Sequence, residues 1–406
     1  MTVRPSEMYK KQKRTVKDLL TSIPNHLLDQ LCAEYDVNWN IKKLYGQEFF
    51  KLCLFGILND NQCSTRILSS YYQNAMFRTY AGIVEGKVVS HSSIAERLEK
   101  IDLRYFEGIF HWLSTTYRNK LTPDSQLRIS RYDSTTTSLS SKLLKYGITY
   151  GQKKKEQEEH SNKSIKFSIG YDGLPFQILF QRNPSEANDN LALGDILKLH
   201  TDSKTDIAVF DRGMQDRQKL ADLSENAQFF VTRLKVDSKF KVVPETTVQK
   251  WSEKTETLQL ISEQKVYLYG GNNKLVQTPF RLIQGTLLTT NEPIFFLSNL
   301  PDNDFSALDI CNFYKKRWDI ECFFRFIKQE LNLKHYFSHS WNGIQVMTYM
   351  ILIAALLLLV FKYTNELKGY RLVKKKFLNE LQDLILKDII IQCGGNPELL
   401  HKVNQT

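Results

Sequence analysis

The segment spanning residues 312–328 constrains the fold of this chain more than any other. Four polar side chains within it are spaced by three, four and seven residues: Tyr314, Arg317, Glu321 and Lys328. At about 100° per residue, these offsets place all four within roughly 60° of one helical face. The adjoining stripe is apolar and would dock the helix on a core: Phe313, Ile320, Phe324 and Ile327. The pattern predicts an amphipathic helix with a carboxylate flanked by three groups that can hold phosphate.

A single carboxylate on a helix does not make a metal site, because Mg²⁺ is usually held by one or two carboxylates together with water and substrate phosphates. Two further segments, residues 128–135 and 207–214, each read as a strand that delivers an aspartate at or near its end. These aspartates are Asp133 and Asp211, and Gly213 would allow the tight exit that follows Asp211. We therefore expect both carboxylates to join the helix face.

Asp172 is the competing candidate, because it also follows an apolar strand, residues 165–171. Its neighbour is Gly173, and a second strand is predicted directly afterwards, over residues 175–181. Asp-Gly between two alternating runs is typical of a hairpin turn. The sequence therefore predicts a structural role for Asp172.

The order of these features is a strand with Asp133, a hairpin, a helix near residues 190–199, a strand with Asp211 and much later the helix with Glu321. This order resembles the catalytic domain of insertion-sequence DDE transposases, and the Tyr-Arg-Glu-Lys spacing is similar to the signature of their IS-four branch. The resemblance covers about residues 127–361. It implies an α/β fold class: an RNase H-like catalytic core with a β-rich insertion between the second Asp and the Glu, preceded by an all-α N-terminal domain.

The resemblance also implies a function, which is metal-dependent cleavage at the ends of a mobile DNA element and strand transfer into target DNA by a cut-and-paste route. Asp133, Asp211 and Glu321 would be the catalytic residues and would hold two Mg²⁺ ions, for which Mn²⁺ could substitute. The partners would be double-stranded DNA, as terminal inverted repeats and as target, and a second copy in a homodimer. A DNA hairpin intermediate is implied by the resemblance alone.

Four residues are candidates for DNA binding: Tyr314, Arg317 and Lys328 on the helix, and Trp251 in the expected insertion. Arg317 and Lys328 would clamp phosphates, and Tyr314 would hydrogen-bond a phosphate oxygen. Trp251 could stack on a flipped base, or it could be an ordinary packed or loop tryptophan.

The 109 residues between Asp211 and Glu321 are too many for a simple connection. After a helix at 216–223 and a strand at 229–234, they predict a β-rich segment with strands at 239–243, 257–261, 265–269 and 278–283. Residues 293–300 then read as the last core strand.

The first 125 residues read as helical, with apolar spacing near 3.6 over residues 24–34, 47–58 and 103–121. Ser93-x-x-Glu96 predicts a capping box that opens a short helix. His91 and Ser92 before it could mark the turn of a helix-turn-helix, or the helices could form a bundle that only supports the core. We expect a DNA-binding domain over residues 1–125 and a core in two parts, 126–235 and 292–361. The insertion would span residues 236–291, and a basic helical region would follow over 362–406.

A net charge of +11 and a pI near 9.1 suit a nucleic-acid partner. The cationic residues fall in runs near residues 10–17, 153–155 and 371–376, and with four further side chains they would form a phosphate-tracking surface: Arg128, Arg131, Arg317 and Lys328. Six cysteines without CxxC spacing and the lack of a signal peptide predict a reduced, cytoplasmic protein, bacterial and nucleoid-associated when bound to DNA.

Residues 346–361 form a nearly continuous apolar run that raises a membrane alternative. Its 16 residues fall short of the roughly 18 to 20 that a bilayer span needs, so we expect a buried helix and no membrane partner. Two other functions stay open, a different RNase H-like nuclease and a catalytically silent, transposase-derived DNA-binding protein. The presence of all three carboxylates argues against the second.

Overall fold

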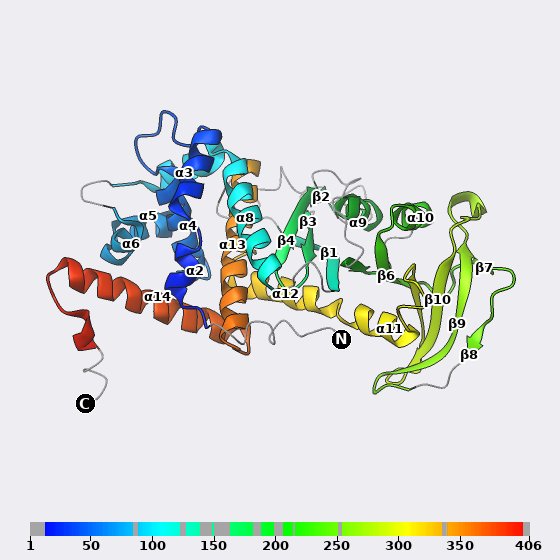
Figure 1. Cartoon of the computed structure of the whole chain (residues 1–406). Coiled ribbons are helices and arrows are strands. Elements are labelled where there is room, and N and C mark those ends of the chain that lie inside the picture. Colours follow the sequence, from blue (N-terminus) through cyan, green and yellow to red (C-terminus); the bar gives the residue numbers. More distant parts are fainter. Residues whose placement is uncertain are drawn as a thin grey trace.

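The computed structural model of the chain describes residues 13–83, 88–121, 127–138, 148–149, 163–181, 188–198, 206–213, 216–250, 254–334, 338 and 340–400. It is a mixed α/β structure, in which a large sheet lies on one side and the N-terminal helices lie on the other (Figure 1). The long helix α13 stands between them (Figure 1).

The described strands form one eleven-stranded sheet with the order β2-β3-β1-β5-β6-β11-β10-β9-β7, to which β4 adds beside β3 and β8 beside β9. β1 pairs in parallel with β5, and β5 with β6, whereas the other pairings are antiparallel. The strand bounds are β1 (Arg128–Ser138), β2 (Ile148–Thr149), β3 (Lys163–Tyr171), β4 (Pro175–Gln181), β5 (Asp206–Phe210), β6 (Phe229–Leu234), β7 (Phe240–Val242), β8 (Gln249–Lys250), β9 (Leu258–Leu268), β10 (Phe280–Leu287) and β11 (Pro293–Ser298).

Helices cover both faces of the parallel strands. Successive side chains of a strand point to opposite sides, so apolar residues on both sides need partners. In β5, Ala208 and Phe210 pack with α9 (Asp189–Lys198) and α10 (Arg217–Glu225). Ile207 and Val209 pack on the other face with α11 (Ala307–Lys315). This explains why β5 is apolar at every position after its first residue, Asp206.

The N-terminal part is helical, as expected from its periodicity. Its helices are α2 (Val16–Thr21), α3 (Asn25–Glu34), α4 (Gly46–Asn59), α5 (Thr65–Gln73), α6 (Ala75–Ala81), α7 (His91–Lys100) and α8 (Leu103–Leu121). The predicted capping box is wrong: Ser90 is the N-cap of α7, its side chain accepts from the Ser93 N–H, and Glu96 pairs with Lys100 at 2.7 Å. His91 and Ser92 are therefore the first turn of a helix.

The apolar run lies within α13 (Trp341–Thr364), and all of residues 343–361 are buried. By length and composition this helix could cross a membrane, but its most apolar window is entirely enclosed by the rest of the protein. Its side chains belong to the same core as the N-terminal helices, β3, α12 (Trp318–Glu330) and α14 (Tyr370–Gln392). The predicted buried helix is confirmed.

Asp172 lies in the hairpin turn between β3 and β4, where Gly173 has a φ of 125° that suits glycine. Its carboxylate is buried and pairs with Arg118 at 2.7 Å and Arg128 at 3.7 Å. The predicted hairpin is confirmed, and Arg128, expected to track phosphates, instead faces Asp172.

β9 differs from the expectation, because the two strands predicted over residues 257–261 and 265–269 are one continuous strand, Leu258–Leu268. The polar residues between them find partners on β10: Ser262 donates to Gln284 at 3.0 Å, and Glu263 pairs with Arg281. Partners on the neighbouring strand thus allow polar side chains in the middle of β9. From periodicity alone, the strand is predicted to end at these polar residues.

Candidate active site

Asp133 and Asp211 emerge beside each other because their strands are parallel neighbours. Tyr132 of β1 is level with Phe210, the last residue of β5. Asp211 therefore follows directly after β5, as expected, whereas Asp133 lies in the middle of β1, which continues to Ser138 beside β3. Glu321 lies in the first turn of α12, a helix that contacts β1. The structure therefore brings carboxylates from three separate parts of the chain to the region where the pairing of β1 with β5 ends.

The predicted signature helix is two helices. The N–H groups of Lys316 and Arg317 donate to carbonyls only three residues back, on Phe313 (3.1 Å) and Tyr314 (2.9 Å), where α11 ends and α12 begins. The apolar stripe predicted for this segment is buried as expected.

Arg131 explains the position of this junction. Its Nε donates to the carbonyl of Lys316 at 3.1 Å, and its Nη2 pairs with Asp319 at 2.9 Å. The Arg131 side chain is only 9% exposed, so the expectation that it tracks phosphates is wrong. It docks the junction on β1 instead.

Arg317 lies among the candidate carboxylates. Its Nη2 is 2.6 Å from Oε1 of Glu321, and its Nη1 is 3.8 Å from Oδ2 of Asp133. The Tyr314 hydroxyl donates to Oδ1 of Asp211 at 3.1 Å. Each carboxylate therefore faces a side chain of the Tyr-Arg-Glu-Lys signature.

The charges of Asp133, Asp211, Arg317 and Glu321 influence one another's protonation. Burial raises the pKa of Asp133 to about 6; the Ser134 N–H and Arg317 oppose this rise, and the charges of Asp211 and Glu321 add to it. Burial also raises the pKa of Tyr314 to about 12, so its hydroxyl stays protonated and able to donate. Although burial opposes it, the pKa of Arg317 is raised by Tyr314, Glu321 and Asp211.

Lys328 also faces this region from α12. Burial and the nearby Lys334 lower the pKa of Lys328, while the charge of Asp133 raises it. Its side chain is half-buried, about two turns beyond Glu321. Trp251 and Lys153 to Lys155 lie outside the described residues.

Within the described part of the chain, no three His, Cys, Asp or Glu side chains lie close enough together to hold one metal ion in the arrangement shown. Asp133, Asp211 and Glu321 supply the hard oxygen donors that a divalent cation such as Mg²⁺ prefers. In this structure a guanidinium, Arg317, bridges two of them.

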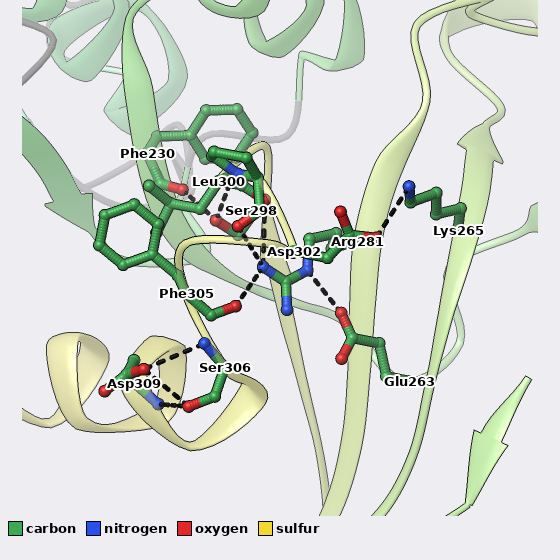
Figure 2. Close-up of polar contacts among 11 residues, drawn as sticks. Phe230, Glu263, Lys265, Arg281, Ser298, Leu300, Asp302, Phe305, Ser306 and Asp309 are labelled. Carbon is green, nitrogen blue, oxygen red and sulfur yellow. Dashed lines mark hydrogen bonds and ion pairs between the residues drawn. The ribbon is translucent and has the colours of Figure 1, made fainter.

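The loop that leads into α11 is fixed by a residue that sequence reasoning missed. Arg281 of β10 pairs with Glu263 of β9 at 2.5 Å and donates to the carbonyls of Leu300 and Phe305 at 3.1 and 2.8 Å (Figure 2). Ser306 then caps α11 through Asp309. The available signal was a charged residue in the middle of each of two apolar strand patterns.

A cavity of about 350 Å³ adjoins Tyr314, between α11 and the strands β9 to β11. Polar and apolar side chains share its wall, among them Thr255, Thr257, Phe296, Asn312 and Lys315. This cavity shares Tyr314 with the candidate site and extends from it towards β9, β10 and β11.

Comparison with known proteins shows which family the chain resembles. Residues 124–357, more than half of the chain, match the family described as "Transposase DDE domain". A Synechocystis sp. protein assigned by its name as a transposase for insertion sequence element IS4SA is 26% identical over 333 residues, 82% of this chain and 86% of that protein. A Sinorhizobium fredii protein assigned as transposase y4zB is 26% identical over 159 residues, 39% of this chain and 43% of that protein.

Proposed function

The chain belongs to the DDE transposase family and is an insertion-sequence transposase, and from this premise we propose that it cuts the ends of its own element and joins them to target DNA by cut-and-paste. Its substrates would be terminal inverted repeats and target DNA, held by a homodimer. We further propose that it is cytoplasmic and nucleoid-associated when bound to DNA.

We propose Asp133, Asp211 and Glu321 as the catalytic carboxylates. The observation that carries this assignment is Arg317, whose guanidinium contacts Glu321 and Asp133 while Tyr314 holds Asp211. Burial, with smaller contributions from the charges of Asp211 and Glu321, raises the pKa of Asp133, and a bound cation would favour its charged form.

The family is generally dependent on a divalent metal, and the carboxylate oxygens of this site are the donor type that such a metal prefers. We propose Mg²⁺, as two ions, held by Asp133, Asp211 and Glu321. Bound there, the metal would activate water or a DNA 3′-hydroxyl and stabilise the leaving oxygen.

The remaining signature residues would act on the DNA. We propose that the Arg317 guanidinium exchanges the Glu321 carboxylate for a phosphate, since its planar fork suits both partners equally. Lys328 would add a point charge for a neighbouring phosphate. Tyr314, protonated at neutral pH, would orient Asp211 and donate to a phosphate oxygen.

We propose that β4, β3, β1, β5 and β6 with α9, α10 and α12 form an RNase H-like core. Three antiparallel strands followed by two parallel ones support it, with the carboxylates on the first and fourth strands in chain order and on a later helix. Strands β7 to β10 would be the insertion, and the helices before residue 125 would form the DNA-binding region.

The test is cleavage by the purified chain, with Mg²⁺, of DNA carrying the inverted repeats that flank its own gene. We expect nicks at the repeat ends, and products on a denaturing gel would show whether a hairpin forms. Asp133→Asn, Asp211→Asn and Glu321→Gln should each reduce cleavage by at least about 100-fold while end binding persists. Near wild-type cleavage by any of them would remove that residue from the site.

A further inference from the structure

Cationic side chains continue from α12 onto α14. Residues 362–376 contain six lysines and arginines and one acidic residue, Glu366. Lys374 is an exception to the expected surface role: it is buried, and its Nζ donates to the Glu330 carbonyl at 2.6 Å and to Asn61 at 2.7 Å. Arg371 and Lys375, by contrast, are exposed.

α12 and the start of α14 lie side by side. The rings of Phe326 and Tyr370 stack with their centroids 4.5 Å apart, and Lys374 reaches the last turn of α12. Figure 1 shows α11, α12 and α14 following one another along one edge of the molecule. A surface that begins at the candidate site can therefore continue along this edge.

Helical spacing places three cations on this surface. Arg325 is exposed and one turn beyond Glu321, about 40° around α12 on the side towards α14. Arg371 and Lys375 are one turn apart, and each directly follows a residue that faces α12, Tyr370 or Lys374. We call Arg325, Arg371 and Lys375 the α12–α14 basic surface.

The charges of this surface are not neutralised by neighbours. Among the residues that the structure describes, none of the three cations forms an ion pair. Two acidic side chains in the first turn of α12 are already paired with other arginines, Glu321 with Arg317 and Asp319 with Arg131. Arg325 lies over the exposed ring of Trp318, at 6.0 Å. Such unpaired cations, next to a site for DNA, suit a polyanion.

We propose that the α12–α14 basic surface binds the phosphate backbone of the duplex beside the scissile phosphate. This inference rests on the proposed function, because the DNA path starts at the candidate site. Duplex DNA carries a charge about every 1.7 Å along its axis. Neighbouring phosphates can therefore contact cations on two helices that lie side by side. The contacts would be independent of base sequence.

The experiment compares duplex binding by full-length variants across a salt series. The probes are a repeat-end duplex, extended on one or the other side of the cut, and a duplex of arbitrary sequence. The slope of log affinity against log salt should fall by about 1 for Arg325→Ala and about 2 for Arg371→Ala/Lys375→Ala. Lys376→Ala is the matched control, because this exposed lysine lies roughly 120° around α14 from the other two.

One extended probe should lose affinity more than the other, which would give the direction of the duplex. A double variant with the slope of Lys376→Ala on every probe would overturn the inference. If it fails to fold, Arg371→Gln/Lys375→Gln, which keeps most of each aliphatic stem, decides by the same comparison. If the wild-type protein binds no duplex, the proposed function itself is overturned. If the variants cleave DNA as the wild type does and keep its salt slopes, this inference alone is overturned.

Discussion

Arg317 places a positive charge among carboxylates that would otherwise repel one another. Its guanidinium contacts Glu321 and Asp133, and it is only 15% exposed. Without it, the carboxylates of three elements would share an edge of the sheet with a charge that only a bound cation could balance. Under the proposed function, we expect the same side chain to affect both the stability of the site and its affinity for DNA.

The first prediction concerns Asp133, whose pKa of about 6 lies above the ordinary 3.8. The unfolded chain releases this proton before the folded chain does, so stability falls as pH rises from about 4 to 6. The full cost, up to about 3 kcal/mol, applies above pH 6. Asp133→Asn should remove it: in EDTA, urea unfolding should show the variant more stable than wild type at pH 7.5 and equal to it near pH 4.

Divalent metal provides the control for this comparison. Mg²⁺ should raise the melting temperature of wild type more than that of Asp133→Asn, because a bound cation would offset the cost of the buried Asp133 charge. Parallel pH profiles for the two proteins in EDTA would show that Asp133 does not carry this cost.

The second prediction separates Arg317 from Lys328. Arg317→Lys keeps the charge but loses the fork, so it should lower cleavage while nearly preserving the salt slope of end binding. Lys328→Ala should flatten that slope by about 1. Single-turnover cleavage and binding across a salt series measure both, and two silent variants would leave these residues as surface charges.

At the scale of elements, helices and strands followed closely from residue periodicity. β6 and α8 have the predicted bounds, and α9 and α10 lie within about two residues of them. Asp133, Asp211 and Glu321 could be placed on their elements for the same reason.

Distant partners explain what the sequence did not reveal. The break between α11 and α12 depends on Arg131, a residue 185 positions away from the carbonyl that it binds. The continuity of β9 depends on Arg281 and Gln284 of the next strand. Spacing within one segment carries no information about such partners, and Arg317 could not be seen to contact Asp133 for the same reason.

The third prediction tests the loop before α11. Arg281→Met should leave Glu263 and the loop carbonyls buried without their partner, and should lower the free energy of unfolding by about 3–5 kcal/mol. Cleavage should fall as well, because α11 carries Tyr314. Urea unfolding and cleavage assays measure the two effects.

Lys265→Ala is the matched control on the neighbouring strand. Its ion pair with Asp302, at 2.9 Å, is 44% and 49% exposed (Figure 2), so its loss should cost less than about 1 kcal/mol. Equal effects from the two substitutions would contradict a structural role specific to Arg281.

At the scale of the whole molecule, α13 joins parts of the chain that lie far apart in sequence. Its core includes α4, α8 and β3, together with α12 and α14. Lys374 and Asn332 add polar ties, the latter donating to the Asp60 carbonyl at 2.5 Å. The N-terminal helices and the candidate catalytic region thus share one interior.

The fourth prediction is that the protein stays in the supernatant after ultracentrifugation without detergent. Leu356→Ala, in the middle of α13, should lower the free energy of unfolding by about 2–5 kcal/mol. Leu386→Ala, on the exposed side of α14, should cost far less. Recovery of wild type only from membranes would contradict the buried position of α13.

The shared helix also sets a timetable for biosynthesis. The N-terminal helices end at Leu121, and the helix that completes their core begins at Trp341, 220 residues later. At roughly 5–20 residues per second, a ribosome needs about 10–40 s to supply it. During that interval the apolar faces of the N-terminal helices are exposed, because α13 has not yet been made. A chaperone that shields these faces should therefore raise the yield of folded protein.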